Sequence, residues 1–76
     1  MAGWHPLKRR EFIRRLRVLG FAGPLRGARH EFLIFGQQRQ TVPSNAEFSV
    51  HQVKMLLRQV GAIMGRNITA DEWEQI

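Results

Sequence analysis

The segment 25–32 is the part of the chain whose residue types and spacing best suit a chemical reaction. It reads Leu-Arg-Gly-Ala-Arg-His-Glu-Phe, so a single imidazole, His30, follows two nearby arginines at the start of an apolar run. Cleavage of an RNA phosphodiester needs a proton transfer at the attacking 2′-hydroxyl or the leaving 5′-oxygen, and a cation near the phosphate. Histidine suits the first task near neutral pH, and Arg26 and Arg29 suit the second. A plainer interpretation, which spacing alone favours, is that His30 only ends a strand on a basic surface.

Other kinds of chemistry find little support in the residues. His5 and His51 lie far from His30 along the chain and have no second ligand at metal-binding spacing, so we expect no metal site. The chain has no cysteine, which excludes disulfides, zinc–thiolate sites and thiol catalysis. The glycines fit no nucleotide-binding loop, and no serine has the partners of a hydrolase triad. We therefore expect no metal and no small-molecule cofactor, with His5 and His51 on the surface.

Charge is distributed unevenly along the 76 residues. The chain has 12 Lys+Arg against 6 Asp+Glu, a formal net charge of +6. Residues 1–40 hold nine basic and two acidic side chains, whereas residues 41–76 hold three basic and four acidic ones. This asymmetry favours a polyanionic partner, nucleic acid rather than membrane, although a merely solvated basic face would have the same composition. The N-terminus has no apolar run typical of a signal peptide or membrane span, so we expect a cytoplasmic protein.

A first helix is expected to open at His5-Pro6, because proline suits a first helical turn, and to end at Gly20. Its apolar residues recur at helical spacing and should be buried: Phe12, Ile13, Leu16 and Leu19. The opposite face carries three arginines, which we expect to contribute phosphate binding but no chemistry: Arg10, Arg14 and Arg17.

Three strands are expected next. Residues 21–26 predict a strand in which Gly23-Pro24 indicates an edge position or a bulge, followed by a turn at residues 27–28. Residues 30–35 predict a central strand because they are apolar on both faces. Residues 36–38 predict a hairpin loop, residues 40–42 a third strand that Pro43 stops, and residues 44–46 a loop.

Two further helices complete the chain. Ser49 is a good N-cap for a helix whose buried and outer faces are both clear from the spacing. The buried face should hold Val50, Val53, Leu56, Leu57 and Val60, and the outer face His51, Lys54 and Arg58. Thr69 with Glu72 three residues later forms a capping box, which predicts a short last helix.

These elements predict one α+β domain over residues 1–76. Consecutive strands with short connections should form a three-stranded antiparallel sheet, and the two amphipathic helices should cover one of its faces. The result is a two-layer sandwich with α-β-β-β-α order and a short C-terminal helix, similar in element order to double-stranded-RNA-binding domains.

The chain also resembles the HicA toxin family, the YcfA-like mRNA interferases. The likeness runs from about Lys8 to Ile76 and rests on the order and spacing of several segments: residues 8–16 (KRREFIRRL), 20–21 (GF), 27–30 (GARH), 41–43 (TVP), 56–59 (LLRQ) and 68–73 (ITADEW). The resemblance implies a metal-independent ribonuclease that a HicB-type antitoxin neutralises. The family's Gly-Ser-x-His type motif maps onto Gly27 and His30, with Ala28 in place of the serine.

The resulting hypothesis is the toxin of a type II toxin–antitoxin system, which cleaves mRNA with His30 as the single catalytic histidine. The residues expected to contact RNA or its phosphates are Arg26, Gly27, Arg29, Lys8, Arg10, Arg14 and Arg17. Two alternatives remain open: a non-catalytic RNA-binding module of the same fold, and a protein-interaction subunit that uses the apolar face of the sheet.

Overall fold

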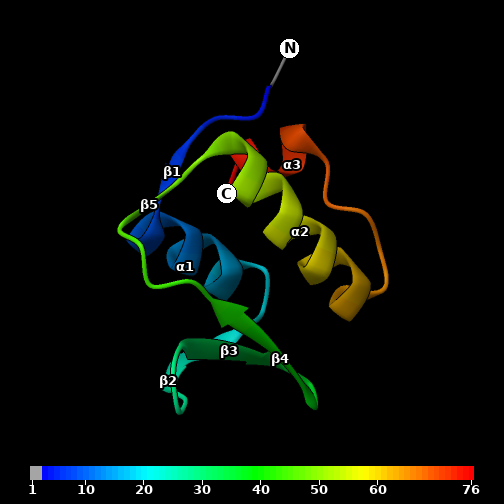
Figure 1. Cartoon of the computed structure of the whole chain (residues 1–76). Helices are drawn as coiled ribbons and strands as arrows, with labels where there is room; N and C mark the ends of the chain where they lie inside the picture. Colours follow the sequence, from blue (N-terminus) through cyan, green and yellow to red (C-terminus); the bar gives the residue numbers. More distant parts are fainter. Residues whose placement is uncertain (1–2) are drawn as a thin grey trace.

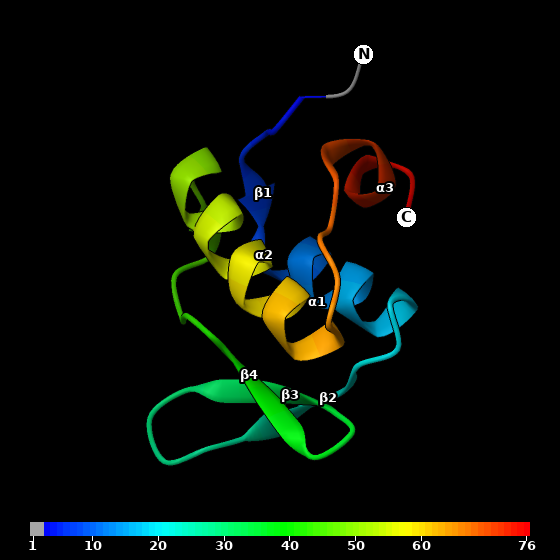
Figure 2. The same ribbon diagram turned by 90° about the vertical axis from the view of Figure 1, so that its right-hand side faces the viewer.

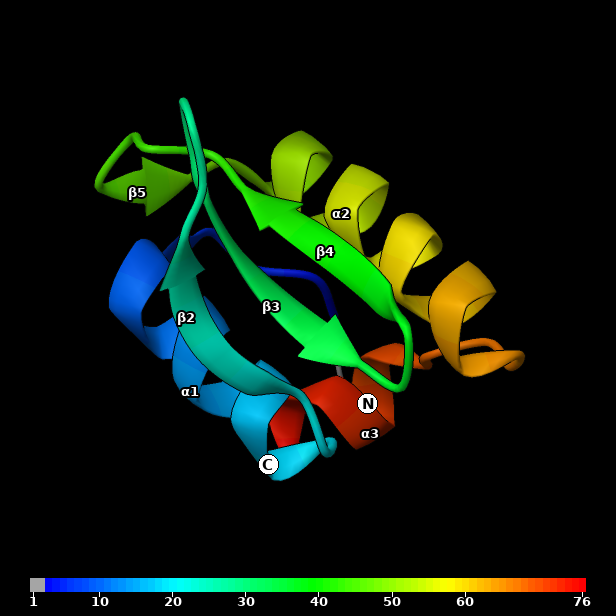
Figure 3. The ribbon, with the colours of Figure 1, turned by 90° about the horizontal axis from the view of Figure 1, so that it is seen from below.

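A three-stranded sheet lies beneath two helices in the computed structural model of the chain, which describes residues 3–76 (Figure 1). The strands are β2 (Ala22–Arg26), β3 (Glu31–Phe35) and β4 (Gln38–Val42), antiparallel and in the order β2-β3-β4. The helices α1 (Arg9–Val18) and α2 (Val50–Met64) cover one face of this sheet, and its other face is bare (Figures 1 and 3). The predicted α+β arrangement with both helices on one face is therefore confirmed.

The central position of β3 follows from its sequence. Side chains of a strand alternate between the two faces of a sheet, and here the middle residue, Leu33, is completely buried beneath the helices. Phe35 points the same way and packs on Phe21, with 5.0 Å between the ring centroids. Phe32 and Ile34 point toward the bare face. The edge strand β2 shows the expected irregularity, because its register shifts between Ala22 and Leu25.

The third strand is longer than expected. It begins at Gln38, two residues before the predicted start, because residues 36–37 alone make the turn. Gly36 has a φ of 62°, a left-handed conformation that suits a tight two-residue hairpin turn. This turn pairs Phe35 with Gln38 and Ile34 with Arg39, which brings Arg39 onto the sheet.

The predicted start of the first helix at His5-Pro6 is wrong. Residues Leu7–Lys8 form a two-residue strand, β1, which pairs with β5 (Glu47–Phe48), so α1 begins only at Arg9. The pairing places Leu7 opposite the buried Phe48. It also lets the Arg9 N–H donate to the Ala46 carbonyl at 2.9 Å, which satisfies one donor at the start of the helix. A tertiary contact thus overrides the local signal of Pro6.

The caps of the later helices are largely as predicted. Ser49 Oγ accepts a hydrogen bond from the Gln52 N–H at 3.1 Å, and α2 ends at Gly65 with a φ of 77°. Thr69 Oγ1 accepts from the Glu72 N–H at 3.1 Å at the start of α3 (Ala70–Glu74). Only this half of the capping box forms, because the Glu72 carboxylate binds Arg66 instead.

The core lies between the sheet and the helices. Phe12 of α1 is at its centre, with ring centroids 5.4 Å from Phe48 and 5.3 Å from Trp73 of α3. The last contact attaches α3 beside α1, which Figure 2 shows from the side. One polar side chain is buried with these residues: Gln40 of β4 donates to the Gln59 side chain at 2.8 Å and so connects the sheet to α2.

Candidate active site

The loop between β2 and β3 carries the predicted catalytic histidine. The Gly27 N–H donates to the His30 carbonyl at 3.1 Å and closes this loop as a turn, as the sequence predicted. A side chain at position 27 would not fit, because a Cβ atom there would lie 2.5 Å from that carbonyl oxygen and 3.3 Å from the Phe32 ring. Gly27 is therefore required for the path of the loop.

An open depression of about 450 Å³ lies beside the loop. Four of the predicted site residues lie together on its wall: Arg26, Gly27, Arg29 and His30. Four residues that were not predicted complete the lining: Arg9, Ala28, Glu31 and Ser44. His30 is exposed, and its imidazole makes no hydrogen bond with any residue from 3 to 76. The imidazole therefore has no hydrogen-bond partner in this part of the chain that a substrate would have to displace.

Arg9 is the residue of this site that sequence reasoning missed. Its Nε donates to the Pro43 carbonyl at 2.8 Å, and its Nη2 donates to Glu31 Oε1 at 2.6 Å. The first residue of α1 is thereby bound to the first residue of β3 and to the segment that follows β4. Since Glu31 comes directly after His30, this ion pair also holds the base of the loop. The only sequence signal was a basic run at residues 8–10, which does not say which arginine turns inward.

Arg26 and Arg29 carry the uncompensated charge of the depression. Arg26 lies directly across the β2–β3 ladder from Glu31, so both project from the same face of the sheet. Glu31, however, pairs with Arg9, and neither Arg26 nor Arg29 has an ion pair within residues 3–76. Both are exposed. Three guanidinium groups around one carboxylate leave the depression electropositive.

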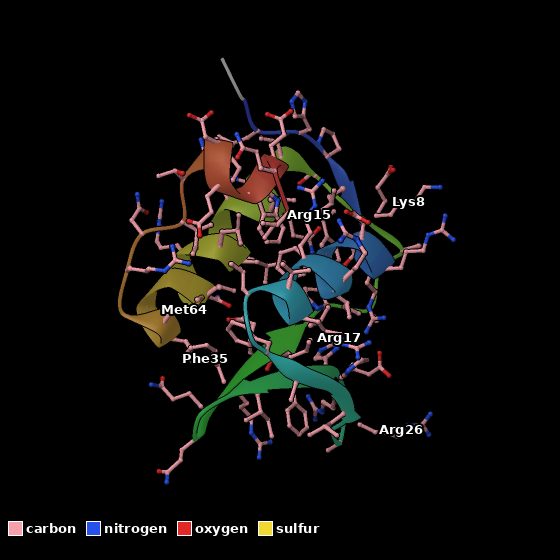
Figure 4. All side chains as sticks on the ribbon, turned by 180° about the vertical axis from the view of Figure 1, so that it is seen from behind. Lys8, Arg15, Arg17, Arg26, Phe35 and Met64 are labelled. Atoms are coloured by element: carbon pink, nitrogen blue, oxygen red, sulfur yellow. The ribbon has the colours of Figure 1, made fainter. Side chains whose placement is uncertain are left out.

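The other predicted phosphate contacts fall into two groups. Lys8 and Arg10 border a neighbouring depression of about 580 Å³ that shares Arg9 and Ser44 with the first. Figure 4 shows Lys8, at the end of β1, and Arg26, at the end of β2, on the same side of the molecule. Arg14 and Arg17 instead line a separate hollow, together with Phe21 and Gly23. The predicted stripe along α1 is therefore divided between two places.

Arg14 is also engaged by other groups of the protein. Both carboxylate oxygens of Glu11 accept hydrogen bonds from it, and its Nη2 donates to the Ile76 carbonyl at 2.8 Å. Hydrogen bonds from Arg14 and then from Arg15 lower the pKa of Glu11 from 4.5 to about 2. Arg14 is less available to a phosphate than Arg10 or Arg17, which are exposed and have no ion pair within the described residues.

The remaining histidines lie on the surface, as predicted. His51 is exposed on the outer face of α2, with Lys54 and Arg58 around the same shallow hollow. His5 Nε2 lies 3.7 Å from a carboxylate oxygen of Glu74. Among residues 3–76, no three His, Asp or Glu side chains are close enough together to hold a metal ion. No helix in this part of the chain is both long and apolar enough to span a bilayer.

Comparison with models of protein families, with curated proteins and with solved structures finds no match to this chain. The resemblance to the HicA family therefore stays a prediction that rests on the sequence motifs.

Proposed function

We propose that the protein is a metal-independent ribonuclease, the HicA-type toxin of a type II toxin–antitoxin system, which cleaves mRNA in the cytoplasm. The observation that carries the proposal is the position of His30. Its exposed imidazole lies at an open depression that Arg9, Arg26 and Arg29 also line. An imidazole, which can transfer a proton, beside several guanidinium groups, which can stabilise charge, meets the two needs of phosphodiester cleavage.

In the proposed reaction, neutral His30 accepts the proton of the 2′-hydroxyl as that oxygen attacks the neighbouring phosphorus. The bond from phosphorus to the 5′-oxygen breaks, and the leaving oxygen takes a proton from water. The hydroxide formed from that water takes back the proton that His30 accepted, which regenerates the neutral imidazole. The products are a 2′,3′-cyclic phosphate and a 5′-hydroxyl end. Arg26 and Arg29 stabilise the charge that develops on the phosphate oxygens. Arg9 acts through position, because it holds Glu31 next to His30.

The path of the RNA away from the reacting phosphate follows the charge. Lys8 and Arg10 border the adjoining depression, so they extend the electropositive surface along the start of α1. Contacts of this kind add affinity that is independent of base sequence and sensitive to salt. Within the same proposal, the α-β-β-β-α order corresponds to a double-stranded-RNA-binding-domain-like fold, and a HicB-type antitoxin inhibits the toxin by covering the depression at His30.

The test is incubation of the purified protein with a defined mRNA, with and without a chelator, followed by analysis of the product ends. We expect shortened RNA with 2′,3′-cyclic phosphate and 5′-hydroxyl ends, at the same rate in the chelator. Addition of a co-purified product of the neighbouring gene should stop the cleavage. Activity that requires a divalent cation, or a tight complex with the partner that still cuts RNA at the full rate, would contradict this account.

A second candidate function is a non-catalytic RNA-binding module. The observation that favours it is the absence of any hydrogen bond from the His30 side chain to residues 3–76, because a catalytic base is commonly oriented by a partner. Such a module would bind the same RNA through the same arginines with a steep salt dependence. Intact RNA recovered after prolonged incubation at saturating protein would establish this function in place of the first.

A further inference from the structure

The bare face of the sheet is toward the viewer in Figure 3. The strand sequences and their register place apolar side chains and one cation on it. Its side chains come from all three strands, and we call this group the outer face: Leu25, Phe32, Ile34, Arg39 and Thr41. Phe32 and Ile34 are half-buried but do not belong to the core beneath the helices. The strands β2, β3 and β4 contain one acidic residue, Glu31, and it projects to the helix side and pairs with Arg9. The outer face therefore has no negative charge of its own.

Phe32 and Arg39 form a stacked pair on this face. The guanidinium carbon of Arg39 lies 4.2 Å from the centroid of the Phe32 ring. Arg39 is exposed, so the pair presents one charged planar group to solvent and an aromatic ring beneath it. Nucleobases stack on such aromatic and guanidinium planes.

The stacked pair also adjoins the candidate active site. Phe32 is two residues beyond His30, a distance of about 7 Å along an extended chain. Its ring lies against the loop, because a Cβ on Gly27 would be 3.3 Å from the Phe32 ring. A strand of RNA whose phosphate lies at His30 therefore has a flat, positively charged surface beside it for an adjacent base.

We propose that Phe32 and Arg39 form a stacking subsite for an unpaired nucleobase next to the phosphate bound at His30, so that the substrate is single-stranded at this point. The subsite rests on the proposed function. The contact of Phe32 with the loop at Gly27, the lack of acidic residues and the presence of two π-planes favour RNA over a protein as the occupant of the outer face. Stacking accepts every base, so this subsite selects unpaired RNA with little preference for base sequence.

The experiment uses the full chain with His30→Gln, which prevents cleavage during binding, and a short single-stranded RNA with 2-aminopurine beside the candidate scissile phosphate. Stacking should quench the 2-aminopurine fluorescence on binding. Phe32→Leu keeps apolar volume but removes the ring, and we expect it to abolish the quench and weaken binding by about 5- to 20-fold. Phe32→Trp should restore the fluorescence quench and the binding affinity. Arg39→Gln should weaken binding more than the matched control Arg58→Gln on α2.

An abasic nucleotide at the same position tests the contact from the RNA side. In the parent it should weaken binding about as much as Phe32→Leu does, and in Phe32→Leu it should cause no further loss. Equal RNA affinity of Phe32→Leu and the parent, with no quench in either, would overturn the subsite, and loss of partner-protein binding in that variant would assign the outer face to a protein instead.

The two proposals fail separately in these measurements. Cleavage that depends on His30 together with unchanged affinity in Phe32→Leu would refute the subsite and leave the ribonuclease standing. Weaker RNA binding in Phe32→Leu together with intact RNA in the parent would refute the ribonuclease and support the subsite. Phe32→Trp also guards against misfolding, since a variant that regains affinity has kept the sheet.

Discussion

The arginines where α1 meets α3 and the arginines around the β2–β3 loop differ in what surrounds them. Arg15 donates to Glu11 at 2.9 Å and to the Trp73 carbonyl at 2.9 Å, and its guanidinium lies 5.3 Å from the Trp73 ring centroid. By contrast, Arg26 and Arg29 are exposed and have no ion pair within the described residues.

The difference indicates that some arginines of this protein stabilise the fold and that others are available to bind a ligand. At the α1–α3 junction arginines attach the C-terminal segment to the first helix, because they satisfy carboxylates and free carbonyl groups there. Arg66, in the segment between α2 and α3, is also a paired arginine: it donates to both carboxylate oxygens of Glu72 at the start of α3 at 2.7 Å. Around the loop, Glu31 carries the one carboxylate of residues 3–76 that lines the depression, so the positive charge is available to a ligand. The comparison predicts that substitutions in the first group lower stability and those in the second lower activity.

The largest effect is expected at His30. Replacement by alanine should lower the rate of RNA cleavage by about 10²- to 10⁴-fold, the usual contribution of a positioned acid or base. The thermal midpoint should barely change, because an exposed loop residue holds little core volume. His51→Ala, on the exposed face of α2, is the matched control and should cleave at the parent rate. Equal losses in the two variants would break the distinction between the loop and the rest of the surface.

Gly27→Ala should have the next largest effect. The added Cβ would lie 2.5 Å from the His30 carbonyl oxygen, so the loop must move and carry the imidazole with it. Misplacement by about 1 Å can cost about 10²-fold in rate, and the overpacking should cost about 1–3 kcal/mol of stability. Cleavage assays measure the loss of rate, and thermal unfolding measures the loss of stability. Gly3→Ala is the control, because nothing lies within 4 Å of a Cβ there. A Gly27→Ala protein with parental activity would show that the loop path is unimportant.

The two groups of arginines can be compared directly. Arg26→Gln and Arg29→Gln should each weaken RNA binding by about 10-fold. Each should also reduce the steepness of the plot of log affinity against log salt concentration by about 1, the amount expected for one lost phosphate contact. Their thermal midpoints should stay unchanged. Arg66→Gln should instead lower the thermal midpoint slightly and leave the salt slope as it is. Titrations at several salt concentrations, beside thermal unfolding, distinguish these outcomes, and a reversed pattern would contradict the assignment.

A smaller contrast is expected along α1. Arg10→Gln and Arg17→Gln together should flatten the salt slope, because both residues are exposed and have no ion pair among residues 3–76. Arg14→Gln should change it least, since Glu11 and the Ile76 carbonyl already hold that side chain. An unchanged slope in the double variant would exclude both Arg10 and Arg17 from the RNA site.

The smallest effect concerns Glu11 and depends on pH. Its folded-state pKa of about 2 lies below the ordinary 4.5, so its contribution to stability is fully present above about pH 4.5 and is lost as the pH falls toward 2. Glu11→Gln should therefore lower the thermal midpoint by less than about 4 °C at pH 7. The difference between variant and parent should shrink as the pH falls below about 4.5 and vanish only below about pH 2, where Glu11 is protonated in the folded state as well. A deficit that stayed constant across this range would show that Glu11 acts through something other than its charge.

Much of the fold could be predicted because its signals are local. The Ser49 cap, the Thr69 cap and the apolar spacing of α2 each lie within a few neighbouring residues. Both caps and four of the five predicted buried residues of α2 are confirmed. Val50 is the exception, because at the first position of the helix it is half-buried and lines the outer hollow beside His51. The β1–β5 pair could not be predicted, because two-residue strands have no periodicity. Gln40 shows the same limit, since its burial depends on the Gln59 side chain 19 residues away.

The candidate site likewise has a local part that the sequence predicts and a long-range part that it does not. The loop that holds Arg26, Gly27, Arg29 and His30 is one short segment, so the sequence already placed these residues together, and the structure finds them around one depression. Arg9 reaches this depression only because β1 and β5 direct the start of α1 toward β3. The contact between Arg9 and Glu31 spans 22 residues, and nothing in the composition of residues 8–10 distinguishes Arg9 from its neighbours. Long-range pairing, rather than residue type, determines that part of the site.

Single-turnover cleavage by His30→Gln at saturating protein tests the central claim most directly. Glutamine keeps a polar side chain of similar reach but does not titrate near neutral pH, so binding and chemistry are separated in one variant. We predict a folded protein that binds RNA with the affinity and salt dependence of the parent and cuts it at least about 10²-fold more slowly. A folded His30→Gln protein that binds RNA and cuts it as fast as the parent would contradict the account and leave the histidine without a catalytic role.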